Sequence, residues 1–509
     1  MALNDVTFVN GQGGLGRALT SRDHISGLIY FIANGSLPSG FSSSDRIKKI
    51  YSIQDAESLG IKSDYSDATG ATGTITVTNK GADGDTLKIT VTEPNGVVVN
   101  LGTYIKVSGD STVTLVAVAL KAMINAGTNT HGYSADNSAG VLTITAPKRM
   151  GTFLNSGTPI AVTIVGTIAQ TLVQFSGGVD SLQAVWHYHI AEYFRLQPKG
   201  VLYLNFCAVP SSYTFSELVT LQNFANGEIR QVGIYKPANA FSTANLTAIQ
   251  TQVDALNAVH KGIACVLLGA DISATTDLST LADLTTLTAQ NVSAVIGQDG
   301  GGLGKFLFQC HTSGKSVTCL GATLGAVSLA TVSQDIAWKA KFNMSSGTEL
   351  DTVAFANGTL FNTISDSQVS ALDSYKYVFL LKNVGSSGTY FNDSHTATSP
   401  ASDYAFIENN RTIDKAIRGV YVSLLPEIAS PIQLNTDGTM SDVTIAHLTS
   451  VCAPNLDQMV RDGDLSNYSV TINPAQDVLA TSKVIISIAL LPKGVARYIQ
   501  VNIGFVTNL

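Results

Sequence analysis

Charged residues are scarce in this chain of 509 residues: Asp, Glu, Lys and Arg together make up 13% of it, whereas hydrophobic residues make up 45%. Globular domains typically carry about a quarter charged residues. This composition indicates that partners cover much of the surface. A large enzyme with big cores and a surface rich in Ser, Thr and Gly would also explain it. The net charge is −7 and no run of Lys or Arg is present, so we expect neither nucleic acid nor lipid as a partner.

The sequence also lacks an apolar run of about 20 residues, the length that spans a bilayer, so we expect no membrane insertion. Its first residues, from Met1 to Asp5, contain no basic segment followed by an apolar one. We therefore expect no secretory signal, and a protein that is made and kept in a cytoplasm until it is released. The cysteines are odd in number and far apart, which predicts no disulfide framework; they are Cys207, Cys265, Cys310, Cys319 and Cys452.

Two glycine-rich segments resemble phosphate-binding loops, but each lacks a part that this chemistry requires. Residues 11–16 fit the G-x-G-x-x-G pattern, yet no β-α-β unit follows them. Residues 300–305 resemble a phosphate loop, yet Asp299 replaces the first glycine and Phe306 replaces the hydroxyl residue that would hold magnesium. We therefore expect turns at both places and no cofactor.

Candidate metal ligands and nucleophiles are equally incomplete. His187 and His189 are two residues apart on an expected helix, so their imidazoles diverge and cannot share one ion. Cys310, His311 and Cys319 lack the paired C-x-x-C spacing of a structural zinc site. No G-x-S-x-G elbow is present. The sequence thus predicts no metal and no catalytic residue, although a site assembled only by folding remains open.

The length exceeds the roughly 250 to 300 residues that one hydrophobic core usually organises, which predicts several domains. Residues 64–179 differ from their surroundings because they are rich in Thr, Val, Ile and Gly and alternate apolar with polar residues. We expect a β-rich module inserted into a host domain, with strands at 74–78, 86–92, 141–145 and 160–164 and a helix at 112–125.

The host domain continues at residue 180 with alternating strand and helix patterns, which predict a parallel sheet covered by helices. The fold class is therefore mixed α/β with several domains. Strands are expected at 201–206, 232–235, 263–268 and 292–296, and helices at 182–196, 215–225, 244–259, 278–287 and 329–339.

The last third contains a buried strand at 377–381 and a long helix at 403–425. Its final residues alternate in polarity on both sides of Pro492, Lys493 and Gly494. This pattern predicts an apolar β-hairpin in which residues 484–490 pair with residues 499–505.

The order of these parts resembles the tail sheath proteins of contractile phages and related contractile injection systems. The resemblance covers residues 1–63 and 180–509 and is strongest at residues 410–415, 468–470 and 496–501, with a further match at 14–17 and 23–28. It implies a sheath-type α/β core with a β-rich inserted domain. The expected parts are an N-terminal arm and start of the core (1–63), an inserted surface domain (64–179), an α/β sheath domain (180–370) and a C-terminal sheath domain with a terminal hairpin arm (371–509).

The resemblance implies a structural role without catalysis or cofactor. Sheath subunits stack as hexameric rings around an inner tube and contract to drive the tube through a cell envelope. The implied partners are further copies of the chain, the tube protein, and baseplate and tail terminator proteins, and the implied location is a virion tail or injection particle assembled in a bacterial cytoplasm.

The resemblance also implies residue roles. Strand exchange between subunits is expected at both chain ends, at Asp5, Val6, Thr7, Phe8, Val9, Ile499, Val501, Ile503 and Phe505. The exposed face of a helix around Arg411, Lys415 and Arg418 is a candidate for contact with an acidic tube, and the alternative is a face that is solvated or forms ion pairs within the chain. Two alternatives remain: an α/β enzyme with an unrecognised site, and a fibre or receptor-binding protein.

Overall fold

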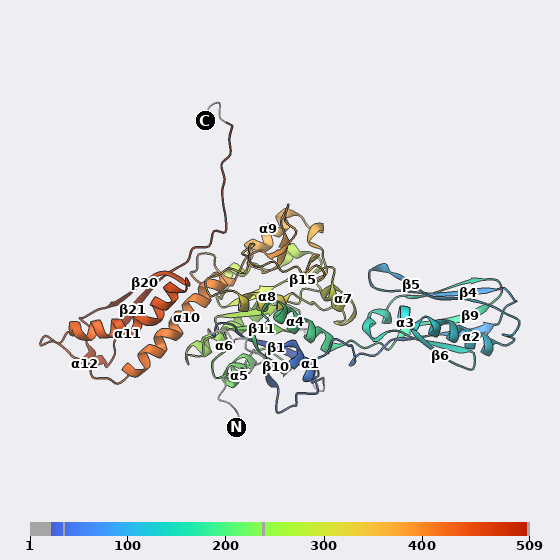
Figure 1. Cartoon of the computed structure of the whole chain (residues 1–509), viewed down its shortest axis with the longest axis horizontal. Helices are drawn as coiled ribbons and strands as arrows, with labels where there is room; N and C mark the ends of the chain where they lie inside the picture. Colours follow the sequence, from blue (N-terminus) through green and yellow to red (C-terminus); the bar gives the residue numbers. More distant parts are fainter. Residues whose placement is uncertain (1–21, 34–35, 237–239, 506–509) are drawn as a thin grey trace, which may run out of the picture.

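The computed structural model describes residues 22–33, 36–236 and 240–505. Three parts follow one another along the long axis: a β-rich module, a central α/β body and a C-terminal part built on two long helices (Figure 1). The predicted mixed α/β class is confirmed.

A six-stranded sheet organises the central body. Its strand order is β14-β12-β11-β1-β10-β2, and every neighbouring pair is parallel except β10 with β2. All residues of β1 are buried, as expected for a strand that is covered on both faces. The strands are β1 (Ile25–Ile32), β2 (Ile47–Ile50), β10 (Val201–Ala208), β11 (Gln231–Tyr235), β12 (Cys265–Gly269) and β14 (Val292–Val295).

Helices cover both faces of this sheet, as predicted. Leu28 and Tyr30 of β1 belong to a core shared with α4 (Leu182–Leu196) and α8 (Leu320–Leu329). Ile29 and Phe31 point the other way, into a core shared with α5 (Glu217–Phe224) and α6 (Thr243–Asn257). The period-two alternation along one strand thus supplies two hydrophobic cores.

Two predicted helices in this body are wrong. Residues 278–287 form two short 3₁₀ turns, Leu278–Thr280 and Leu284–Thr286, instead of a helix. Residues 330–339 are irregular, and the helix of this region is α8, immediately before them. The remaining short elements of the body are α1 (Ile53–Ser58), β13 (Thr288–Ala289), β15 (Gly297–Asp299), α7 (Leu303–Cys310), β16 (Val353–Phe355), η6 (Phe361–Thr363), α9 (Asp366–Ser374), β17 (Leu380–Lys382), β18 (Thr389–Phe391) and β19 (Ala397–Thr398).

The β-rich module contains two sheets around a hydrophobic core of its own. One sheet has the order β6-β7-β3-β9 and the other β5-β4-β8, and helix α2 (Val113–Ala126) packs with them. Its two connections to the body run side by side, because Thr69 and Val179 exchange backbone hydrogen bonds of 3.2 and 3.0 Å. The strands are β3 (Thr72–Asn79), β4 (Thr86–Thr92), β5 (Val98–Ile105), β6 (Ser134–Ser138), β7 (Val141–Thr145), β8 (Ile160–Val165) and β9 (Ala169–Ser176), with short turns at Pro94–Gly96, Thr128–His131, Lys148–Met150 and Phe153–Asn155.

His311 joins the module to the body. Its Nδ1 accepts a hydrogen bond from the Ser181 backbone N–H at 3.0 Å, so its Nε2 carries the proton and donates to the Arg149 carbonyl at 2.7 Å. The Thr152 N–H also donates to the Cys310 carbonyl at 3.1 Å. These contacts, called the module joint below, tie the module to the end of α7 and the start of α4.

The C-terminal part consists of α10 (Ile407–Leu424), α11 (Asp442–Arg461) and an antiparallel pair of strands, β20 (Leu465–Ile472) and β21 (Ile486–Pro492), with short turns at Leu425–Glu427 and at α12 (Val478–Thr481). The predicted terminal hairpin is therefore wrong, since β21 pairs with β20 and not with residues 499–505. From residue 493 to residue 505 the chain forms no strand and extends away from the body (Figure 1). We call residues 493–505 the arm.

Candidate interaction site

The predicted exposed basic face on α10 is turned inward. Arg411 is only 2% exposed, and its Nη1 donates to the carbonyls of Ala330 and Thr331, both at 3.1 Å. Its Nη2 donates to the carbonyl of Asp23 at 3.3 Å. The expectation that Arg411 lies on an exposed surface is therefore wrong, because backbone carbonyls of the body bind its guanidinium.

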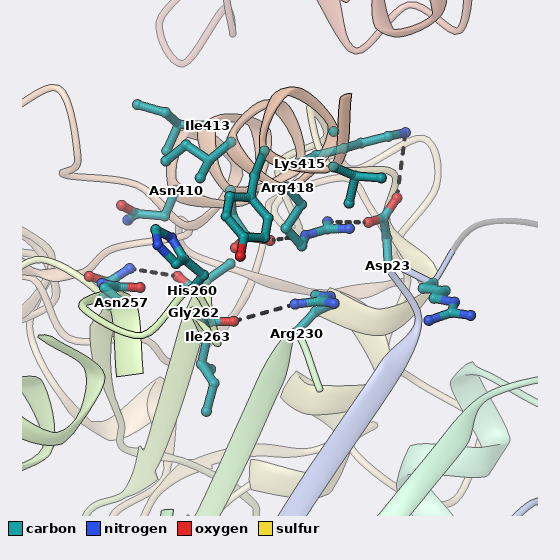
Figure 2. Close-up of a pocket in the computed structure, with 18 of the residues that line it drawn as sticks. Asp23, Arg230, Asn257, His260, Gly262, Ile263, Asn410, Ile413, Lys415 and Arg418 are labelled. Carbon is teal, nitrogen blue, oxygen red and sulfur yellow. Dashed lines mark hydrogen bonds and ion pairs between the residues drawn. The ribbon is translucent and has the colours of Figure 1, made fainter. Parts of the chain in front are cut away.

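Lys415 and Arg418 converge on the Asp23 carboxylate, as Figure 2 shows. Arg418 Nη2 lies 2.7 Å from Asp23 Oδ1 and Lys415 Nζ lies 3.4 Å from Asp23 Oδ2. Burial opposes ionisation of Asp23, but the charges of Arg418 and Lys415 outweigh it and hold its pKa below the ordinary value. Lys415 also pairs with Asp464 and Arg418 with Asp414. The basic face is thus mainly an internal ion-pair network, and only parts of Lys415 and Arg418 remain accessible.

These ion pairs border a cavity of about 830 Å³, which lies between α10 and the amino ends of the strands of the central sheet (Figure 2). Its walls include residues just before β1, β11, β12 and β14, namely Asp23, Arg230, Ala264 and Asn291. Burial, together with the nearby charge of Arg418, lowers the pKa of Arg230 to about 10. Open α/β sheets bind ligands outside the carboxyl ends of their strands. This cavity lies at the amino ends, where α10 meets the body.

The backbone amides of residues 300–304 already donate hydrogen bonds within the chain. Asp299 is fully buried, and its carboxylate accepts the N–H groups of Gly301, Gly302 and Gly304 at 3.0 to 3.1 Å. Glu349 accepts the N–H of Leu303 at 2.9 Å. The carboxylates thus take the place that a phosphate would occupy. Residues 11–16, the other glycine-rich segment, lie outside the described residues.

The histidines near Trp186 do not form a metal site. His187 pairs with Glu57 at 3.0 Å, whereas His189 is buried in the core, where burial lowers its pKa to about 3. In the described part of the chain, no group of three or more His, Cys, Asp or Glu side chains is arranged to hold a metal ion. All five cysteines are buried and unpaired. Among the described residues, no helix has the length and apolar character needed to cross a membrane.

An apolar groove runs between α10 and β21. Ile417, Val422 and Ile428 beside it are 58%, 64% and 69% exposed, which is unusual for side chains of this size. This groove was not predicted from the sequence, although apolar residues recur at helical spacing along α10 and indicate a second apolar face. Its lining comprises His260, Ile413, Ala416, Ile417, Val420, Tyr421, Leu424, Leu425, Ile428, Leu456, Ile488 and Leu490.

The arm carries a further exposed apolar surface. Ile499, Val501, Ile503 and Phe505 are 76%, 70%, 92% and 110% exposed and alternate with Gln500, Asn502 and Gly504. In an extended chain this spacing places the four apolar side chains on one face. Residues Asp5, Val6, Thr7, Phe8 and Val9, which were expected to act in the same way, lie outside the described residues.

These features define an α/β protein that is suited to association with other chains. They are the covered parallel sheet, the two-stranded sheet beside an apolar groove and the exposed apolar arm. The chain belongs to the DUF2586 family. Residues 3–395 match the DUF2586 N-terminal domain and residues 403–509 match the DUF2586 C-terminal domain.

The chain is also similar to solved structures of sheath and baseplate proteins. The anti-feeding prophage sheath in its contracted state is 16% identical, with a TM-score of 0.45 over 64% of this chain and 83% of that chain. A chain of the six-fold symmetrised anti-feeding prophage baseplate is 16% identical, with a TM-score of 0.43 over 63% of this chain and 80% of that chain. The sheath tail protein of Listeria innocua is 9% identical, with a TM-score of 0.38 over 94% of this chain and 97% of that chain. No curated protein matches the chain.

Proposed function

We propose that this chain is a structural subunit of a contractile tail sheath, in which the arm of one copy adds a strand to β21 of another. The observation that carries the proposal is that one chain has both an exposed apolar arm and an open apolar groove. An arm and a receiving edge on the same chain are sufficient to link identical subunits.

One edge of β21 is free and its side chains line the groove. In the described part of the chain, β20 and β21 pair only with each other. Ile488 and Leu490 of β21 line the groove together with residues of α10. A strand placed beside β21 would gain backbone hydrogen bonds and cover the exposed side chains of α10 at the same time.

The arm has the pattern that this position requires. With Ile499, Val501, Ile503 and Phe505 turned toward α10, the residues between them would face solvent. Full burial of four such side chains contributes about 6 to 12 kcal/mol, before the costs of ordering the arm and joining two molecules. A strand exchanged in this way connects neighbouring copies without requiring a rigid body-to-body interface.

The direction of the arm leaves it available to another copy. Figure 1 shows the arm extending away from the body instead of folding back toward β21. A contact between the arm of one copy and the groove of the next is head-to-tail, and such contacts generate rings or helical assemblies.

The rest of the proposal follows the sequence resemblance. Subunits stack as hexameric rings around an inner tube, and residues 5–9 provide a second exchanged strand. Triggering allows subunits to rotate into larger interfaces while the arms keep them connected, so that the difference in packing free energy drives the tube. Baseplate and terminator proteins close the two ends of the polymer.

The test compares the two faces of the arm. One variant carries Ile499→Asp and Ile503→Asp on the apolar face, and its matched control carries Gln500→Asp and Asn502→Asp on the polar face. Full-length wild type and both variants are expressed alone and imaged by negative-stain electron microscopy. We expect long hollow tubes from the wild type and from the control, and dispersed subunits from the apolar-face variant.

Tubes formed equally well by the apolar-face variant would exclude the arm as the link. Discrete particles from all three proteins would count against a sheath and favour the enzyme interpretation.

A further inference from the structure

Three carboxylates meet where the arm leaves the body. They come from separate segments: Asp335 from the loop after α8, Asp393 from the segment after β18, and Glu408 from the first turn of α10. These residues are only 6%, 9% and 3% exposed. Like charges gathered away from water repel one another and lose hydration, so the pocket requires a positive group.

Arg497 of the arm supplies this group. Its Nε lies 3.0 and 2.9 Å from the two carboxylate oxygens of Asp393, and its Nη2 lies 3.2 Å from Asp335 Oδ2 and also contacts Glu408 Oε1. The Cζ atom of Arg497 lies 3.5 Å from the centre of the Phe406 ring. The planar guanidinium is thus bound along its edge by carboxylates and on one face by an aromatic ring, an arrangement that a lysine cannot reproduce.

A guanidinium offsets the repulsion among these carboxylates. Burial and the neighbouring Glu408 and Asp393 raise the pKa of Asp335, because a further negative charge is unfavourable in this pocket. Withdrawal of Arg497 would remove the positive charge and the hydrogen bonds that it supplies to the three buried carboxyl groups.

The other described residues of the arm are held much less. Among residues 493–505, the ion pairs to the body all come from Arg497. The residues that follow it, 498–505, are exposed throughout. The arm is therefore attached to the body at one point and extends freely beyond it.

We propose that the pocket of Asp335, Asp393 and Glu408 is the anchor of the arm, in which Arg497 stays in its own subunit while residues 498–505 pair with another copy. The destination of residues 498–505 rests on the proposed function, whereas the anchor itself is a property of the single chain. Arg497 is a positioning residue: it fixes the point from which the exchanged strand starts.

Trypsin tests the anchor directly, since it cuts after Lys and Arg and must draw the side chain into its own pocket. Lys493, four residues before Arg497 and exposed, is an internal reference. We expect cutting after Arg497 to be at least tenfold slower than cutting after Lys493 in the unassembled chain, as followed by mass spectrometry of intact protein. The Ile499→Asp, Ile503→Asp background keeps the chain unassembled.

Neutral isosteres in the pocket should release the anchor. With Asp393→Asn and Glu408→Gln, we expect the two sites to be cut at similar rates, whereas the exposed pair Asp366→Asn and Asp403→Asn should leave the difference unchanged. R497K keeps the charge but loses the planar fork, and should be cut at position 497 nearly as fast as at Lys493. Because R497K does not alter the body, it still tests the anchor if the pocket variant fails to fold.

Equal cutting after Lys493 and Arg497 in the unassembled chain with an unaltered pocket would overturn the anchor. Protection of Arg497 that appears only in assembled protein would also overturn it, because the pocket would then belong to a neighbour. Tube formation is scored separately by microscopy, so failure of the anchor and failure of the sheath proposal are distinguished.

Discussion

Gly321 allows α8 to lie directly against the backbone of α4. A Cβ atom at this position would lie 2.1 Å from the His189 carbonyl oxygen, closer than any side chain tolerates. Because the obstacle is backbone, it cannot move aside without shifting α4, which packs on the central sheet.

We therefore expect Gly321→Ala to destabilise the body by about 1 to 3 kcal/mol, the usual cost of overpacking. Urea unfolding followed by tryptophan fluorescence measures this, since Trp186 lies in the same core. Gly109→Ala is the control, as a Cβ atom added there would have no other atom within 4 Å and the backbone of Gly109 is not left-handed. Equal stability of the two variants would refute the close packing of these helices.

The module joint depends on a neutral His311. Burial lowers the pKa of His311 below the ordinary value of about 6.5, and its hydrogen bond to Arg149 and the nearby Asp180 and Asp67 offset part of this effect. Protonation of Nδ1 would remove the acceptor for the Ser181 N–H. The folded state therefore binds the proton less readily than the unfolded state, and the stability of the joint is present above about pH 6.5 and falls as the pH drops below it.

We expect acidification from pH 7.5 to pH 5 to loosen the module joint in wild type more than in His311→Gln, which has no imidazole to protonate. Hydrogen exchange of the Ser181 and Thr152 amides at the two pH values is the measurement. The same loss of protection in both proteins would assign the effect to other groups.

The basic residues of α10 show the limit of prediction at the residue scale. Helical spacing correctly places Arg411, Lys415 and Arg418 on one side of a helix. Whether that side faces solvent or the body depends on Asp23, whose position nearly 400 residues earlier carries no local signal. The sequence therefore specifies the face but not what the face contacts.

At the scale of elements, prediction succeeded where an amphipathic pattern and a cap coincide. The bounds of α4 were predicted correctly, and the Ser181 side chain caps this helix by accepting the Ala184 N–H. Four strands of the central sheet (β10, β11, β12 and β14) and four strands of the module (β3, β4, β7 and β8) were also predicted, with end points shifted by a few residues. The other strands of these sheets, β1, β2, β5, β6 and β9, were not predicted.

Prediction failed where burial is complete. Every residue of α8 from Leu320 to Ser328 is buried, so the helix has no polar face and therefore no helical periodicity to detect. In residues 278–287, Asp277 and Asp283 each accept an N–H two residues later and fold the chain into separate short turns.

The terminal hairpin failed for another reason. Its two segments have the alternating pattern of strands, but this pattern does not specify which strand each one pairs with. Arg497 binds acidic side chains that lie 89 to 162 residues earlier, and this long-range contact directs the arm away from β21. Residues 499–505 therefore have a sequence that is suited to strand pairing but form no strand within their own chain.

The groove on α10 yields an element-scale prediction. Ile417→Asp would place a carboxylate where an incoming strand packs, so we expect loss of tubes together with an unchanged melting temperature. Val443→Asp on α11 is the control, because Val443 is also exposed, at 71%, but lies outside the groove. Sedimentation of assembled protein is the measurement, and equal pelleting of both variants would exclude the groove as the receiving site.

At the scale of the whole molecule, the β-rich module is expected to be dispensable for folding of the rest. It has its own core, and Thr69 and Val179 are neighbours, so a short Gly-Gly linker can replace residues 70–178. We expect the shortened chain to fold and to assemble, with tubes that are thinner if the module lies on the outside. Loss of the central fold would show that the body requires the module.

The position of the module has a mechanical consequence. The arm and the α10 groove both belong to the C-terminal half of the chain, and the module lies at the far end of the long axis (Figure 1). Tension passed between linked copies would enter the body at Arg497 and leave through α10 and β21. In the proposed assembly the module would carry none of this tension, and we expect changes in the sequence of its strands to leave the strength of the assembly unaffected.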